Sequence, residues 1–99
     1  MGKIRTTPYD VVDHLRTRRE MAAYLDVTLE ESGDDAVIVK RALHNVARVQ
    51  GLAKVARRAG MSRERLCSVL SGRSALEFQT FVRVVRALGM KLGAEAIGK

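Results

Sequence analysis

The chain has no tryptophan, two tyrosines, two phenylalanines, one proline and one cysteine. A core with so few aromatic side chains must be built from Leu, Val, Ala, Ile and Met, which favours closely packed helices. The single thiol, Cys67, cannot form an internal disulfide, as expected for a reducing compartment. No apolar run approaches the roughly 20 residues that span a bilayer, and the first residues are too polar for a secretory signal. We therefore expect a cytoplasmic protein without contact to a membrane.

Patterns that carry enzymatic or metal chemistry are also missing. The sequence contains no phosphate-binding glycine loop, no nucleophile elbow and no zinc-ligand spacing. The two histidines, His14 and His44, are 30 residues apart and have no cysteine or paired carboxylate at ligand spacing. We expect no enzymatic activity, no metal and no cofactor, and we interpret both histidines as solvated.

The length of 99 residues and the apolar content of 46% allow one modest core, and no linker is evident. We therefore predict a single domain over residues 1–99. The predicted fold is all-α, a compact bundle of five to six helices. The tail, residues 90–99, is compatible with a short strand or with no regular structure.

The net charge of +7 conceals a difference between two parts of the chain. Residues 1–35 carry five Lys/Arg and eight Asp/Glu, a net charge of −3, whereas residues 36–99 carry thirteen and three, a net charge of +10. A basic region of this density attracts polyanions, and nucleic acid is the usual target. A solvated helix face can show the same charge, so charge alone does not decide between the two interpretations.

Capping signals and helical periodicity predict the first helices. After a short helix over residues 9–16, Thr17 and Glu20 form a capping box that begins a helix ending at Ser32-Gly33. The next helix follows Asp34 and Asp35, whose charge favours a helix start, and ends at Gly51. We predict that it buries a stripe and exposes a polar ridge on the opposite side. The stripe consists of Val39, Ala42, Leu43, Val46 and Ala47, and the ridge of Lys40, Arg41, His44, Asn45 and Arg48.

Residues 52–72 have the pattern of two short helices joined by a glycine turn. Val55 and Ala56 pack inside the first helix, Gly60 takes the left-handed turn, and Leu66 and Val69 anchor the second helix. This is the layout of a helix-turn-helix whose second helix enters a DNA major groove. A last helix over about residues 77–88 follows, with Val84 outside its buried stripe. That stripe consists of Phe78, Phe81, Val82, Val85 and Leu88.

The exposed residues of this unit carry the groups that recognise DNA. Arginine can bind guanine through two hydrogen bonds, glutamate can accept from cytosine, and serine can serve either base. Ser62 also caps the second helix. Cys67 is either a small contact surface or a buried filler. The arginines and the glutamate could instead form only local salt bridges. The predicted base contacts are Arg63, Glu64, Arg65 and Ser68, and the predicted phosphate contacts are Lys54, Arg57, Ser62 and Arg73.

The central pattern resembles the lambda-repressor-like helix-turn-helix family. Over residues 8–92 the chain is also similar to a narrower group, the addiction-module antidote proteins of bacterial toxin–antitoxin pairs. The stretches that carry this resemblance are PYDVVDHL, REMAAYLDVTLEE, ALHNVARVQGLAKVARRAGMSRERL and FVRVVRALGMKL. The resemblance implies a homodimer that binds double-stranded DNA at its own operator and represses its own operon. It also implies that the protein neutralises a small toxin, commonly of the RelE or ParE type.

The acidic first third fits this interpretation, because it offers a complementary surface to a basic toxin. We therefore assign the candidate toxin-binding region to residues 8–50, and the helix-turn-helix with its packing helix to residues 51–92. Acidic residues near helix starts also stabilise the macrodipole without any partner. The alternatives are a stand-alone phage-type regulator and a basic adaptor that binds RNA or protein. The acidic residues that would form the toxin-binding surface are Asp10, Asp13, Glu20, Asp26, Glu30 and Glu31.

Overall fold

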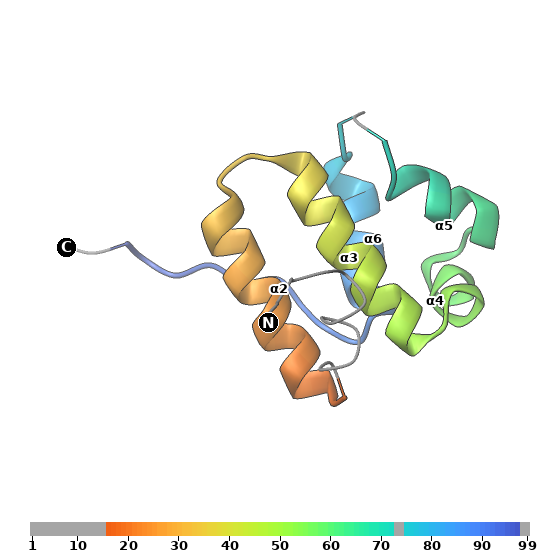
Figure 1. Ribbon diagram of the computed structural model, residues 1–99, viewed down its shortest axis with the longest axis horizontal. Coiled ribbons are helices and arrows are strands. Elements are labelled where there is room, and N and C mark those ends of the chain that lie inside the picture. The colour runs from red at the N-terminus through yellow and green to blue at the C-terminus, as the bar shows by residue number, and fades with distance from the viewer. Residues whose placement is uncertain (1–15, 73–74, 98–99) are drawn as a thin grey trace, which may run out of the picture.

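The computed structural model describes residues 16–72 and 75–97 (Figure 1). These ranges contain helices and no strand, which confirms the predicted all-α fold. Residues 90–97 have no regular structure, so the strand alternative is wrong there. The helix predicted over residues 9–16 lies outside the described residues, apart from Arg16, which is not helical. The helices are α2 (Arg18–Ser32), α3 (Ala36–Gln50), α4 (Leu52–Ala59), α5 (Arg63–Val69) and α6 (Phe78–Ala87).

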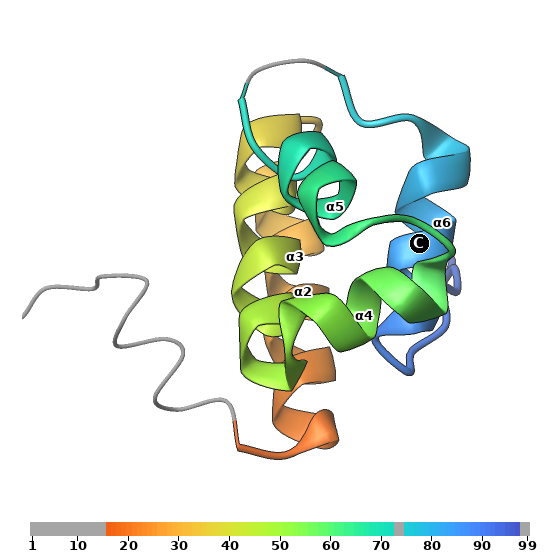
Figure 2. The ribbon, with the colours of Figure 1, turned by 90° about the vertical axis from the view of Figure 1, so that its right-hand side faces the viewer.

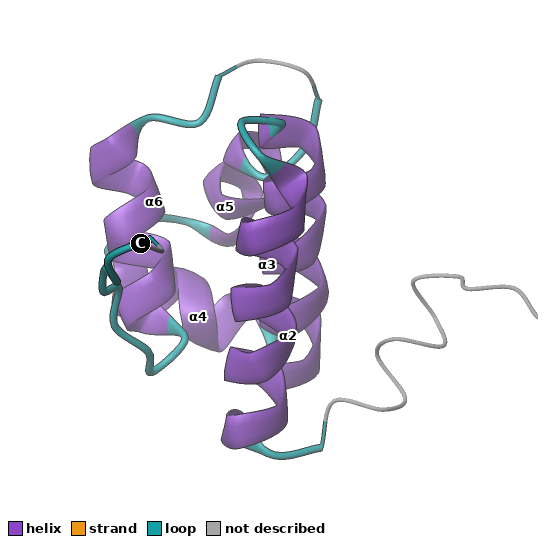
Figure 3. Ribbon diagram, turned by 90° about the vertical axis from the view of Figure 1, so that its left-hand side faces the viewer, coloured by secondary structure: helices purple, strands orange, loops and turns teal. Residues whose placement is uncertain are grey.

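The helices α2 and α3 lie side by side and run in opposite directions (Figures 2 and 3). The helix α4 crosses near one end of this pair and packs against α3, α5 and α6. It therefore connects the α2–α3 pair to the rest of the molecule. One core cluster joins all five helices, with buried side chains of Met21, Leu25, Ala42, Leu43, Val46, Ala47, Val55, Ala56, Ala59, Leu66, Leu70, Val84, Val85, Ala87 and Leu88.

The predicted capping box begins α2. Thr17 Oγ1 accepts a hydrogen bond of 3.0 Å from the Glu20 amide, and Glu20 Oε1 accepts one of 2.9 Å from the Thr17 amide. The amides of Arg16 and Thr17 both donate to the Glu20 carboxyl and lower its pKa. The helix ends at Gly33, where φ is 64°. Both predicted ends of α2 are confirmed.

The helix α3 is bounded as predicted, with Asp35 as its N-cap and Gly51 at its end. The predicted stripe is buried, with Val39 partly so. The predicted polar ridge is wrong at Lys40 and Asn45, which are 1% and 4% exposed. The reason is that α2 and α4 both pack against α3 and enclose more than one stripe of it. Asn45 Nδ2 donates a hydrogen bond of 3.1 Å to Tyr24 Oη on α2.

The helix α6 is rotated from the predicted orientation. Phe78 was expected to be buried and is 74% exposed, whereas Val84 was expected outside the stripe and is 0% exposed. Phe78 is the first residue of α6 and extends beyond the core, whereas Val84 and Leu88 lie one turn apart on the side that faces it. Phe81 and Val82 are partly buried, and Val85 and Leu88 are buried as predicted.

The turn after α4 provides a test of the fold. At Gly60 φ is 75°, and a Cβ would meet no atom within 4 Å, so an added methyl group would strain only the backbone. We expect Gly60→Ala to lower the free energy of unfolding by about 1 to 2 kcal/mol, measured by urea denaturation. Gly93→Ala is the control, because its Cβ also meets no atom and its φ is not positive. Equal effects of the two substitutions would contradict this explanation.

Candidate nucleic-acid interface

The residues between α4 and α5 form a tight turn with defined hydrogen bonds. Gly60 adopts the left-handed conformation, with φ 75° and ψ 33°. The amide of Met61 donates to the Ala56 carbonyl at 3.0 Å, which satisfies an acceptor at the end of α4. Ser62 Oγ then accepts a hydrogen bond of 3.0 Å from the Arg65 amide and begins α5. The predicted turn and the predicted cap are both confirmed.

Apolar side chains support α4 and α5 from beneath. Val55 and Leu66 are both 0% exposed and belong to the same core cluster. Val69, predicted as an anchor, is only partly buried, whereas Leu70, which the sequence analysis did not single out, is 4% exposed. Leu70 follows Leu66 by four residues, and this helical spacing was the signal that could have identified it. Leu66 and Leu70 therefore anchor α5 to the core, whereas the polar side chains of the helix are exposed. Figure 2 shows α5 on the side of the molecule that faces the viewer.

The predicted base contacts are all exposed, and they divide between two sides of α5. Glu64 and Ser68 are one turn apart and share the outer side. Arg65 lies one turn before Val69, and both line a hollow together with Leu76 at the approach to α6. Arg63 is exposed in the first turn of α5. The structure thus places Arg63, Glu64 and Arg65 in the first turn of α5 and Ser68 one turn later, with Arg65 at the flank of the helix.

Three of the four predicted phosphate contacts lie in the described residues, and all three are exposed: Lys54, Arg57 and Ser62. Lys54 also lines a hollow with Arg18 and Arg58. Arg73 lies outside the described residues. Cys67 is partly buried, which favours the filler interpretation over a contact surface.

Four basic side chains of α4 and α5 have no intramolecular partner in the described part of the chain. Lys54, Arg57, Arg63 and Arg65 make no side-chain hydrogen bond or ion pair there. The described residues therefore show no salt bridge between Glu64 and the neighbouring arginines, which was the alternative interpretation of these side chains. Residues 51–72 hold five Lys/Arg and one Asp/Glu, so the surface is basic and its charges are not neutralised within the described chain.

Two side chains that the sequence analysis did not assign stabilise the end of α6. Gln50 Nε2 donates a hydrogen bond of 2.9 Å to the Leu88 carbonyl, and Arg58 Nη1 donates one of 3.4 Å to the Ala87 carbonyl. A cation is favourable there, because the C-terminal end of a helix is electronegative. Arg58 therefore has a role in the fold, although it looks equivalent to Arg57 in the sequence.

The described residues contain no group of three His, Cys, Asp or Glu that could hold a metal ion. His44 is partly buried and not simply solvated as expected, and His14 lies outside the described residues. Burial lowers the pKa of His44, and the neighbouring Arg48 guanidinium lowers it further, so the imidazole is neutral at pH 7. None of the described helices is both long and apolar enough to cross a membrane.

These features define the class of the protein as a small all-helical protein that exposes a basic helix pair. The chain belongs to the family described as "probable addiction module antidote protein", whose model matches residues 5–96. An uncharacterized protein of Haemophilus influenzae strain Rd is 36% identical over 83 residues, which is 84% of each chain. No solved structure matches this chain. Family membership confirms the narrower resemblance and implies an antitoxin role with a cognate toxin partner, whereas the lambda-repressor-like resemblance stays a prediction.

The neighbouring arginines of α4 allow a matched test of which cation serves the fold. We expect Arg58→Met to lower the free energy of unfolding by about 1 kcal/mol, because it removes the hydrogen bond to the Ala87 carbonyl. Arg57→Met, at a side chain without such a contact, should change it by less than about 0.5 kcal/mol. Urea denaturation of both variants checks this, and a larger loss for Arg57→Met would reverse the assignment.

Proposed function

We propose that this antidote protein binds its own operator through α4 and α5, represses its operon as a dimer, and neutralises a toxin of the RelE or ParE type. The observation that supports DNA binding best is the pair of helices joined at Gly60, with Ser62 as the cap of the second helix. The positive charges of Arg63 and Arg65 on that helix have no ion-pair partner in the described chain. Family membership supports the toxin partner. A stand-alone regulator would share the DNA chemistry but lack the toxin.

Each exposed side chain of α5 has a chemical role in this proposal. Arg63 and Arg65 donate paired hydrogen bonds to guanine, Glu64 accepts from cytosine, and Ser68 serves either base. The predicted phosphate contacts orient the protein on the duplex without reading its sequence. Those contacts are Lys54, Arg57, Ser62 and Arg73.

The exposed side of α6 supports the dimer. Phe78, Val82 and Arg86 recur every four residues and form one row on α6, and the Phe78 ring is 74% exposed. When two copies of this row pair in opposite directions, each Phe78 ring faces an Arg86 guanidinium of the other copy, and the two Val82 side chains meet. Cation–π contacts of this kind are favourable. A symmetric dimer presents two α5 helices, one for each half-site, and the half-sites of helix-turn-helix dimers are about 34 Å apart.

DNA binding is tested with a duplex from the region upstream of the chain's own gene, against a scrambled duplex. We expect the upstream duplex to bind more tightly, and Arg63→Ala to weaken that complex by about 1 to 3 kcal/mol while it changes binding to scrambled DNA little. Arg57→Ala should weaken both complexes alike. It should also reduce the slope of log affinity against log salt concentration by about one, because one phosphate contact is lost. Equal affinity of the parent protein for both duplexes would refute the proposal.

Dimerisation is tested at Phe78. We expect Phe78→Ser to shift the protein from dimer to monomer in sedimentation equilibrium and to weaken operator binding, without loss of the fold, because the ring contributes little to the core. Ile97→Ser is the control, since Ile97 is 98% exposed but lies outside α6 and the row that Phe78 begins. A dimer that persists in Phe78→Ser would place the interface elsewhere.

A further inference from the structure

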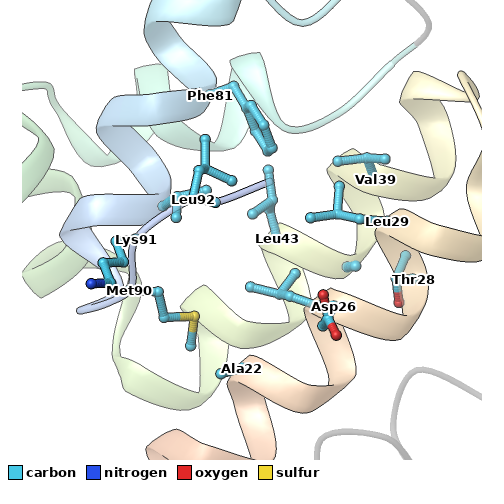
Figure 4. A pocket seen from close by; sticks show the side chains of 14 residues that line it. Ala22, Asp26, Thr28, Leu29, Val39, Leu43, Phe81, Met90, Lys91 and Leu92 are labelled. Carbon is cyan, nitrogen blue, oxygen red and sulfur yellow. The ribbon is translucent and has the colours of Figure 1, made fainter. Parts of the chain in front are cut away.

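An apolar groove lies between α2, α3, α6 and the segment 90–93 (Figure 4). Its volume is about 120 Å³, close to the roughly 150 Å³ of a cavity that holds one benzene molecule. It can therefore accept apolar side chains from a partner. Its apolar lining includes the side chains of Leu29, Val39, Leu43, Phe81, Met90 and Leu92.

One edge of the groove is acidic. Asp26 lines the groove, and Glu30 follows it one turn later on the same side of α2. Residues 20–39 hold six Asp/Glu and no Lys/Arg, in a chain whose net charge is +7. Within the described ranges no hydrogen bond or ion pair engages Asp26, Glu30 or Glu31. Among the described residues, the only cation that lines the groove is Lys91, which comes from the opposite wall.

Two of these carboxylates are in a position that is unfavourable for the isolated chain. Glu30 and Glu31 lie in the last turn of α2, which contains no basic residue. The C-terminal end of a helix is electronegative, so carboxylates there are repelled by the macrodipole. Helix-start stabilisation explains Glu20 and Asp35 but cannot explain Glu30 and Glu31. Charges that oppose the helix dipole in this way are expected at functional surfaces.

The groove is separate from the candidate nucleic-acid interface. No residue of α4 or α5 lines it. Two opposite views show this separation: α5 is the helix nearest the viewer in Figure 2, and α2 is the helix nearest the viewer in Figure 3. A partner in the groove would therefore leave the exposed side of α5 accessible.

We propose that the cognate toxin docks in this groove through a positively charged amphipathic segment. Its apolar side chains enter between α2 and α6, and its Lys or Arg side chains pair with Asp26, Glu30 and Glu31. Charge complementarity favours this occupant over a second copy of the chain, whose α2 would bring like charges together. The inference rests on the proposed antitoxin role and adds to it the surface and the kind of toxin segment that it binds.

Two neighbouring alanines of α2 provide a matched test. Ala22 and Ala23 are both exposed, but only Ala22 lines the groove. The probe is the purified product of the gene next to the chain's own gene, and binding is measured by titration calorimetry. We expect Ala22→Trp to weaken the complex by about tenfold or more, because the indole fills the groove, and Ala23→Trp to leave it unchanged. Both variants should bind the upstream duplex like the parent protein.

The charge contribution is tested with the double variant Glu30→Gln, Glu31→Gln. We expect slower association with the same probe and a weaker salt dependence, together with an unchanged or higher melting temperature of the free chain. Glu95→Gln, at an exposed carboxylate of the segment 90–97, is the control and should change neither quantity.

The possible failures are distinguishable. Equal binding of the probe by Ala22→Trp and Ala23→Trp would overturn the groove as the docking site and leave the antitoxin role intact. No binding by the parent protein would overturn both, and the DNA titration would still judge the repressor role. A changed oligomeric state or a lower melting temperature of free Ala22→Trp, relative to Ala23→Trp, would show that the chain itself occupies the groove and would also overturn the inference.

Discussion

The left-handed backbone at Gly60 is the constraint on which the arrangement of the described surface depends. It ends α4 after eight residues and lets Ser62 begin α5 two residues later, so both helices direct their apolar sides into one core. Val55 and Leu66 are fully buried on either side of this turn. A side chain at the turn would oppose this geometry through the backbone alone, since the space around Gly60 is open.

Helix ends were predictable from the sequence, whereas the exact buried faces were not. The caps at Thr17 and Ser62 involve partners within three residues, so the local sequence contains all the information they need. The exposure of Asn45, Phe78 and Val84 depends on which helices pack against α3 and α6. The spacing of apolar residues predicts which side of a helix is buried, and how wide that side is, only when other elements cover the helix from one direction.

The same distinction applies to the candidate sites. The exposure of Arg63, Glu64 and Ser68 follows from the register of α5, which the Ser62 cap and Leu66 fix locally. The role of Arg58 depends on the Ala87 carbonyl, which is 29 residues away, and no local pattern distinguishes Arg58 from Arg57. The groove was equally inaccessible to sequence reasoning, since its lining comes from three helices and the segment 90–93.

The separation of charge along the sequence corresponds to a separation in space. Asp26 lines a groove that α5 does not line, and Glu30 lies one turn further along α2, so these carboxylates do not neutralise the arginines of α5. On our proposals, a basic toxin segment that covers Asp26 and Glu30 removes negative charge from the complex and makes the whole assembly more attractive to DNA phosphates. Screening limits this effect to about 10 Å, so it acts mainly on association and not on base recognition. Where it changes affinity, linkage requires that operator DNA tighten toxin binding by the same factor.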